Sequence, residues 1–157
     1  MDNLLNSEAT TALILLGILI VSYGILRSIF FPAVKKLANR TSTFIDDLFL
    51  DKKFLNKLSY VVVFIIFNIL TATPEFSIDL FKNVIVSRLI DAAFALLVGL
   101  TILEVLSVFN KISEKIDVLK DRPIKGYIQI LKIIISAFVV IIIFAIVTGQ
   151  SVAYYIS

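Results

Sequence analysis

Residues 121–148 read DRPIKGYIQILKIIISAFVVIIIFAIVT, a short polar segment followed by the most apolar run of the chain. Lys125, Gln129 and Lys132 are spaced i, i+4 and i+7, which places them on one face of a helix. The apolar residues that follow are numerous enough to cross a bilayer core of roughly 30 Å as a helix. The stretch therefore predicts a transmembrane helix whose polar face begins at a membrane surface.

The composition extends this prediction to the whole chain. Hydrophobic residues make up 59% of 157 positions, above the ~45–50% of a typical soluble domain. His and Cys are both absent, which removes thiolate nucleophiles, imidazole bases, disulfides and the usual zinc ligand sets. We therefore expect a membrane protein that is not an enzyme and carries no cofactor. Its net charge of +3 comes from lysines clustered beside apolar segments, which indicates membrane orientation and not nucleic-acid binding.

The expected fold is an all-α membrane protein that forms a single domain over residues 1–157, since no internal repeat or linker divides it. Each of four apolar segments has, or nearly has, the length of a bilayer-spanning helix. These spans are expected near residues 10–31, 54–72, 84–108 and 127–148. The first is expected to stop at Pro32, because proline disfavours a helix interior. The second has the shortest continuous apolar centre of the four.

The distribution of Lys and Arg predicts how the chain is oriented. Seven lie between Arg27 and Lys57 and five in residues 111–125, whereas residues 73–83 carry only Lys82. By the positive-inside rule, the first and third connections are expected in the cytoplasm. Four spans then put both chain ends on the outer side.

The first connection contains RTSTFIDDLFLDKKFLNKL at residues 40–58. Its apolar spacing predicts a short cytoplasmic amphipathic helix at about 42–50, and Asp51 interrupts the pattern before the next helix. This helix either lies on the inner leaflet or is an ordinary capped connector. In the first case Lys52, Lys53 and Lys57 would contact anionic lipid, at roughly 1 kcal/mol each.

Charged residues inside the third span require partners or water. Asp91 is the deepest, Arg88 lies three residues before it, and Asn68 is expected at a similar depth in the second span. The three residues suit either an intramembrane ion or proton site or a polar helix-packing contact. We favour packing, because a proton route usually needs further acids or His along its length. Asp91 also lacks the second deep carboxylate that aspartyl-protease chemistry requires.

Small residues in the same span predict a close helix contact. Ala95 and Gly99 follow Asp91 at intervals of four and share its helical face. A stripe of this kind allows another helix to approach.

Two stretches resemble a known family. Between Asp121 and Ser151, Pro123 is followed by Lys125 and Gly126, then Gln129 and Lys132, an Ile-rich span and Gly-Gln-Ser at 149–151. This pattern resembles the small-conductance mechanosensitive channel family, in its multi-span, miniconductance-type branch. The Thr, Asp-Asp, Phe and Leu pattern at residues 40–58 is similar to the same branch.

The resemblance implies that the chain is the N-terminal tension-sensing region of a channel in the bacterial inner membrane, which opens on osmotic downshock. In this family a Gly- and Ala-rich pore helix, a cytoplasmic β-domain and a seven-subunit assembly follow, and the chain ends at Ser157 before a match to them. The expected partners are membrane lipids and other copies of the subunit. Lys125 and Lys132 would hold the fourth span at the inner headgroups, and Pro123 and Gly126 would fix where it begins. Plain positive-inside anchoring explains the two lysines equally well.

Two further functions remain open at this stage. A stand-alone four-helix accessory or assembly protein without a pore fits the same spans. A transporter fragment is less favoured, because the sequence shows neither a discontinuous helix nor paired polar sites. The reading frame beyond Ser157 would separate the channel from the accessory protein.

Overall fold

The computed structural model describes residues 2–38, 51–76, 78–113 and 124–156, and this part of the chain is helical without strands. Four of its helical segments are long and apolar enough to cross a membrane, so the chain is a multi-pass membrane protein of the all-α class. The helical elements are α1 (Asp2–Ile25), η1 (Leu26–Phe30), α2 (Phe31–Ala38), α4 (Lys52–Thr71), η2 (Pro74–Phe76), α5 (Asp79–Lys82), α6 (Val84–Ser113), α8 (Ile124–Thr148) and α9 (Val152–Ile156).

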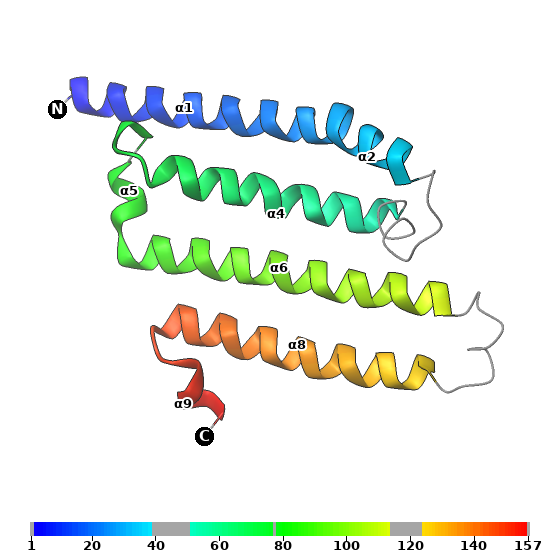
Figure 1. Cartoon of the computed structure of the whole chain (residues 1–157). Helices are drawn as coiled ribbons and strands as arrows, with labels where there is room; N and C mark the ends of the chain where they lie inside the picture. The colour runs from blue at the N-terminus through cyan, green and yellow to red at the C-terminus, as the bar shows by residue number, and fades with distance from the viewer. Residues whose placement is uncertain (1, 39–50, 77, 114–123, 157) are drawn as a thin grey trace.

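The long helices lie side by side in one antiparallel layer, in the order α1, α4, α6, α8 (Figure 1). Helix α6 packs most extensively on α8 and less extensively on α4, and α1 packs on α4. The α1 N-terminus and the α8–α9 turn lie at the same end of the layer (Figure 1). Each inner helix therefore has two helical neighbours and two uncovered faces.

A single layer buries little of its own apolar surface. None of the described side chains is less than 2% exposed, while Leu13 and Ile133, on the two outermost helices, are both 70% exposed. In water such surface would be an association patch. In a bilayer it faces lipid tails, and the helices satisfy their backbone hydrogen bonds internally. The fold is thus built for lipid on both faces.

The first span does not stop at Pro32. The helix continues to Ala38, through a five-residue π-helical turn at Leu26–Phe30 in which the Phe31 N–H donates to the Leu26 carbonyl. Proline has no N–H to donate, and its ring crowds the carbonyl four residues earlier. A wider turn immediately before the proline loosens that contact, so the helix passes through it.

The other spans begin and end near the predicted residues. Helix α4 begins at Lys52, directly after the interruption predicted at Asp51. Helix α6 runs five residues past the predicted end at 108, to Ser113, and α8 spans Ile124–Thr148. The surface helix expected at 42–50 and Pro123 both lie outside the described residues.

A Schellman motif ends α8. Gly149 has φ +71°, its N–H donates to the Ile146 carbonyl, and the Gln150 N–H donates to the Ala145 carbonyl. Glycine adopts this left-handed conformation without a Cβ penalty. The short helix α9 follows, so the chain turns sharply at this end of the layer.

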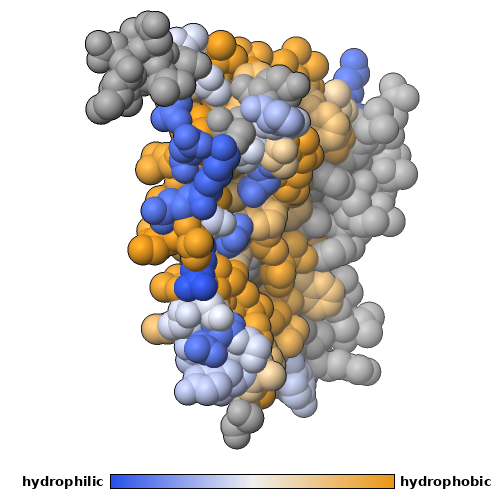
Figure 2. All heavy atoms as spheres, turned by 90° about the vertical axis from the view of Figure 1, so that its left-hand side faces the viewer, coloured by the Kyte–Doolittle hydropathy of each residue, from blue (hydrophilic) through white to orange (hydrophobic). Residues whose placement is uncertain are grey.

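Polar residues are gathered at the end of the layer that carries α5 and the α8–α9 turn. Figure 2 looks onto this end: a band of hydrophilic side chains runs down it, and hydrophobic side chains flank the band. Asp79 and Lys82 of α5 are exposed here and pair at 2.7 Å. That hydrogen bond raises the pKa of Lys82 above its usual value. This end therefore has the composition of a membrane–water boundary.

Candidate functional site

The main polar contact between helices joins α4 to α6. Lys57 Nζ lies 2.5 Å from Glu104 Oε2 and donates more weakly to the Leu100 carbonyl, at 3.4 Å. The Glu104 side chain is 10% exposed and that of Lys57 is 32% exposed. A carboxylate in a helix interface is tolerated when a cation neutralises it. The pair therefore fixes where α4 meets α6.

A second contact joins α6 to α8 one turn further along. Lys132 Nζ donates to Ser107 Oγ at 2.9 Å, and both side chains are partly buried. Ser107 follows Glu104 at i+3, a spacing that brings two helix positions close together. Helix α6 thus holds α4 through Glu104 and α8 through Ser107, within about one helical turn of each other.

A third contact closes the same end of the layer. Lys111 Nζ lies 2.6 Å from Asp51 Oδ2, while Asp51 Oδ1 accepts from the N–H groups of Lys53 (2.8 Å) and Phe54 (3.1 Å) as the N-cap of α4. Burial would raise the pKa of Asp51. The bonds from Lys111 and the two N–H groups outweigh it and lower the pKa below 3.8. One carboxylate therefore both caps α4 and binds α6.

These contacts form a polar seam, defined as Asp51, Lys57, Glu104, Ser107, Lys111 and Lys132. An apolar cluster of Phe31, Phe54, Leu55 and Val108 lies at the same end of the layer. Through Phe31 it packs α2 against α4 and α6. The chemistry of the seam is ion pairing and hydrogen bonding between helices. It ties α4, α6 and α8 together at one end of the layer.

The structure places the predicted lipid-contacting lysines in two different settings. Lys57 and Lys132 bond to neighbouring helices within the seam, where the sequence predicts lipid contact. Lys52 and Lys53 are exposed in the first turn of α4, and Lys125 is exposed at the start of α8. Long amphipathic stems let a lysine serve either setting, so position within a span does not distinguish them.

Gly126, expected with Pro123 to fix where the fourth span begins, is exposed, and a Cβ placed there would meet nothing within 4 Å. No described element fills the space at that position.

Among the described residues, no hydrogen bond or ion pair joins the three polar residues that were expected to meet in the membrane. Asn68 donates to the Phe64 carbonyl of its own helix at 3.0 Å. The guanidinium of Arg88 lies against Gly149, at the end of α8. Asp91 is exposed on α6, and Arg88–Asp91 is not among the ion pairs of the described residues. Asp91 therefore does not belong to the polar seam.

Close approach of α6 and α8 depends on Gly99. It is buried, and a Cβ there would lie 2.6 Å from a methyl group of Val139. Ala92 is also buried on α6, Ala95 is partly buried, and Asp91 is exposed. The contact with α8 thus uses Gly99 without the whole predicted stripe.

Sequence reasoning missed the seam as a unit. Glu104, Ser107 and Lys111 are spaced i, i+3 and i+7 near the end of a mostly apolar helix, and such spacing marks one helical face. That signal was present, but the identity of the partners depends on how neighbouring helices are aligned.

Comparison of the chain with protein-family models, with curated proteins and with solved structures finds no match. Within the described ranges, no group of three or more His, Cys, Asp or Glu side chains is placed to hold a metal ion.

Proposed function

We propose that this chain is the transmembrane tension-sensing region of a mechanosensitive ion channel in the bacterial inner membrane, contributing to protection against osmotic downshock. The observation that supports the proposal best is the single layer of four spans with apolar side chains exposed on its helices. The sequence resemblance to the small-conductance mechanosensitive channels agrees with it. The remainder of such a channel would consist of pore and cytoplasmic parts and further copies of the subunit.

Tension shifts an equilibrium only between states that differ in membrane area or lipid contact. A layer of helices changes both when its members tilt, because each helix meets lipid directly. The seam joins α4, α6 and α8 at one end, whereas the main packing of α1 on the described long helices is against α4. We expect α6 and α8 to move as a unit and α1 to move relative to them.

A second function, a stand-alone membrane accessory or assembly protein, is favoured by one observation. Asp91 is an exposed carboxylate in a membrane span, and no described residue pairs with it. Such a group usually faces water or a partner. A cationic residue on a helix of another protein would complete it.

The chain has no Cys, so introduced cysteines label specifically and can test the proposal. Spin labels at Ile20→Cys on α1 and Ile133→Cys on α8 occupy exposed positions. We expect their distance distribution to change when proteoliposomes swell osmotically. Pulsed electron paramagnetic resonance measures it in swollen and isotonic vesicles.

A matched pair at Ile102→Cys and Ile133→Cys spans the tightly packed α6–α8 contact and should change much less. An α1–α8 distance that is the same in swollen and isotonic vesicles would contradict tension sensing and favour the accessory protein.

A further inference from the structure

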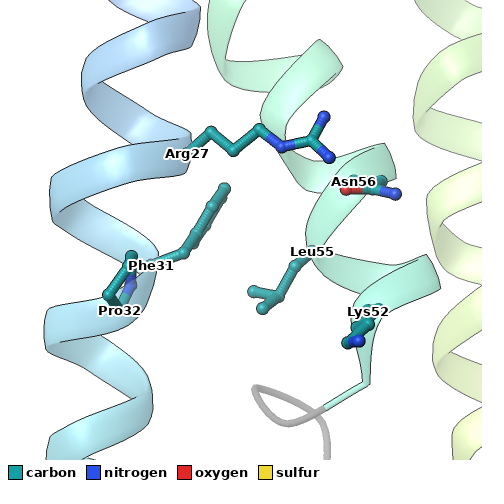
Figure 3. Close-up of a pocket in the computed structure, with 6 residues that line it drawn as sticks. All are labelled: Arg27, Phe31, Pro32, Lys52, Leu55 and Asn56. Carbon is teal, nitrogen blue, oxygen red and sulfur yellow. The ribbon is translucent and has the colours of Figure 1, made fainter.

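A cavity of about 270 Å³ opens between α1–α2 and α4, and the seam's residues do not line it. Figure 3 shows Arg27 reaching from the first span toward α4, with Phe31 and Pro32 beneath it and Leu55 pointing back from α4. Lys52 and Asn56 complete the lining. The cavity thus combines an apolar floor with three side chains that donate hydrogen bonds.

The charge of the cavity suits an anion. Arg27 donates to the Tyr23 hydroxyl at 2.8 Å, which uses one of the five N–H donors of a guanidinium. In the described part of the chain no carboxylate pairs with Arg27 or Lys52. Arginine binds phosphate oxygens in a bidentate manner, and lysine adds a point charge. These groups would recognise a phosphate.

A second, apolar chamber of about 480 Å³ lies further along α4, between α1, α4, α5 and α6. It is lined by Leu19, Tyr60, Val63, Phe64, Phe67, Phe81, Ile90 and Leu97. Lys52 of the first cavity and Val63 of the chamber are eleven residues apart on α4, or about 16 Å at 1.5 Å per residue. This is close to the depth of one leaflet, half of a hydrocarbon core of roughly 30 Å.

Two tyrosines link the cavity to the chamber. Tyr23 and Tyr60 stack with ring centroids 5.8 Å apart. Tyr60 lines the chamber, and the Tyr23 hydroxyl holds Arg27 at the cavity. Tyrosine is typical of membrane–water interfaces, where one end of its ring is apolar and the other polar. Along one groove the polar site therefore comes first and the apolar chamber second. This is the order of the headgroup and the acyl chains in a phospholipid.

We propose that the α1–α4 groove binds an anionic phospholipid, with its phosphate at Arg27 and Lys52 and an acyl chain in the apolar chamber. The site is independent of the channel function proposed above, because it needs only the groove between two spans. Its occupant sits between α1, which has few contacts, and the helices of the seam.

Native mass spectrometry of the full chain in detergent tests the site with dioleoylphosphatidylglycerol, dioleoylphosphatidylcholine and glycerol 3-phosphate. We expect phosphatidylglycerol to bind more tightly than phosphatidylcholine. The variant Arg27→Gln/Lys52→Gln should weaken phosphatidylglycerol binding about 25-fold, since each basic residue contributes about fivefold. The matched control Lys36→Gln/Lys53→Gln removes the same charge outside the cavity and should change the affinity far less.

Two variants separate the parts of the ligand. Val63→Phe narrows the chamber and should weaken binding of both lipids, whereas Arg27→Lys keeps the cation and should retain most of the preference for phosphatidylglycerol. Circular dichroism confirms that each variant keeps its helical content.

Three results would overturn the proposal. These are equal losses in the cavity and control variants, phosphatidylglycerol affinity unchanged by Val63→Phe, and glycerol 3-phosphate binding as tightly as the lipid. The last would indicate a site for free phosphate compounds.

Discussion

At the scale of single residues, the described ion pairs that involve the long helices join one helix to another and do not run along one helix. Lys57 reaches Glu104, and Lys111 reaches Asp51. Arg88 lies at the C-terminal turn of α8, although Asp91 is only three residues away. A helix C-terminus carries free carbonyls and the negative end of the helix dipole, so it competes with a nearby acid for a cation. Sequence separation predicted Asp91 as the partner of Arg88, and the ion pairs of the described residues do not include that pair.

Asp51 offers a test at this scale, because one oxygen caps α4 and the other binds Lys111. Asp51→Ala removes both contacts and should lower the free energy of unfolding by about 1–2 kcal/mol. Asp51→Asn keeps a cap acceptor and loses the charge, so it should cost less. Denaturation in mixed micelles measures the free energy, and amide exchange at Lys53 and Phe54 reports the cap.

The pH dependence of this contact follows from the lowered pKa of Asp51. A carboxyl whose pKa is lower in the folded state stabilises the fold above its unfolded value of 3.8, and that stabilisation is lost as the pH falls through the folded pKa. The stability difference between wild type and Asp51→Asn should therefore be full at neutral pH and shrink below pH 3.8. A difference that stays constant through this range would contradict the Asp51–Lys111 pair.

At the scale of elements, the sequence predicts the helices better than it predicts their contacts. Long apolar segments with charged ends locate all four spans, since the bilayer thickness sets their length. The first span passes Pro32 because a π-turn accommodates the ring, and no periodicity rule signals such a turn. The polar seam depends on the register between α4, α6 and α8, which the sequence of each helix leaves undetermined.

The Lys57–Glu104 pair makes a testable prediction for α4 and α6. Glu104→Leu leaves Lys57 without its partner and should lower the free energy of unfolding by about 1–3 kcal/mol, less than for a fully buried pair because Lys57 can reach solvent. Lys57→Met/Glu104→Leu removes both charges and should restore much of the loss. Denaturation in mixed micelles compares the single and double variants.

Lys82→Gln is the matched control for these variants. It breaks the exposed pair with Asp79, and exposed pairs contribute little. A Glu104→Leu variant as stable as this control would show that the seam does not hold α4 to α6.

At the scale of the whole molecule, the chain forms a layer one helix thick. Apolar residues occur around most of each span, so the sequence fits either a layer or a two-by-two bundle. The distinction lies in which helices touch, and α6 meets α4 on one side and α8 on the other. The fold class can be predicted from the sequence, whereas only the structure shows how the spans are arranged.

The layer predicts that both faces of α6 meet lipid. The chain has no Trp, so a single introduced Trp reports its own surroundings. Leu100 and Ile102 are 39% and 43% exposed. Because they are two positions apart on the helix, their side chains point about 200° apart. Fluorescence of Leu100→Trp and of Ile102→Trp should both be quenched by brominated lipid.

Phe94→Trp provides the comparison, because Phe94 stacks on Phe64 of α4 with ring centroids 5.2 Å apart. It should be quenched less than either exposed position. Protection of Leu100→Trp or of Ile102→Trp to the same degree would indicate that another helix covers that face.

The π-turn at Leu26–Phe30 acts as a one-residue insertion in the first span. Leu15 and Phe31 are both buried, yet their separation in an uninterrupted α-helix would turn them about 160° apart. Absorbing one residue in the wider turn reduces this angle to about 60°, which brings both onto neighbouring parts of one face. Deleting a single residue at this turn would leave the two residues fifteen positions apart in a regular α-helix, again about 60°, so both would stay on this face. Deleting a residue elsewhere in the span would rotate everything after it away from α4, so the first span tolerates a change in length at this turn better than at its other positions.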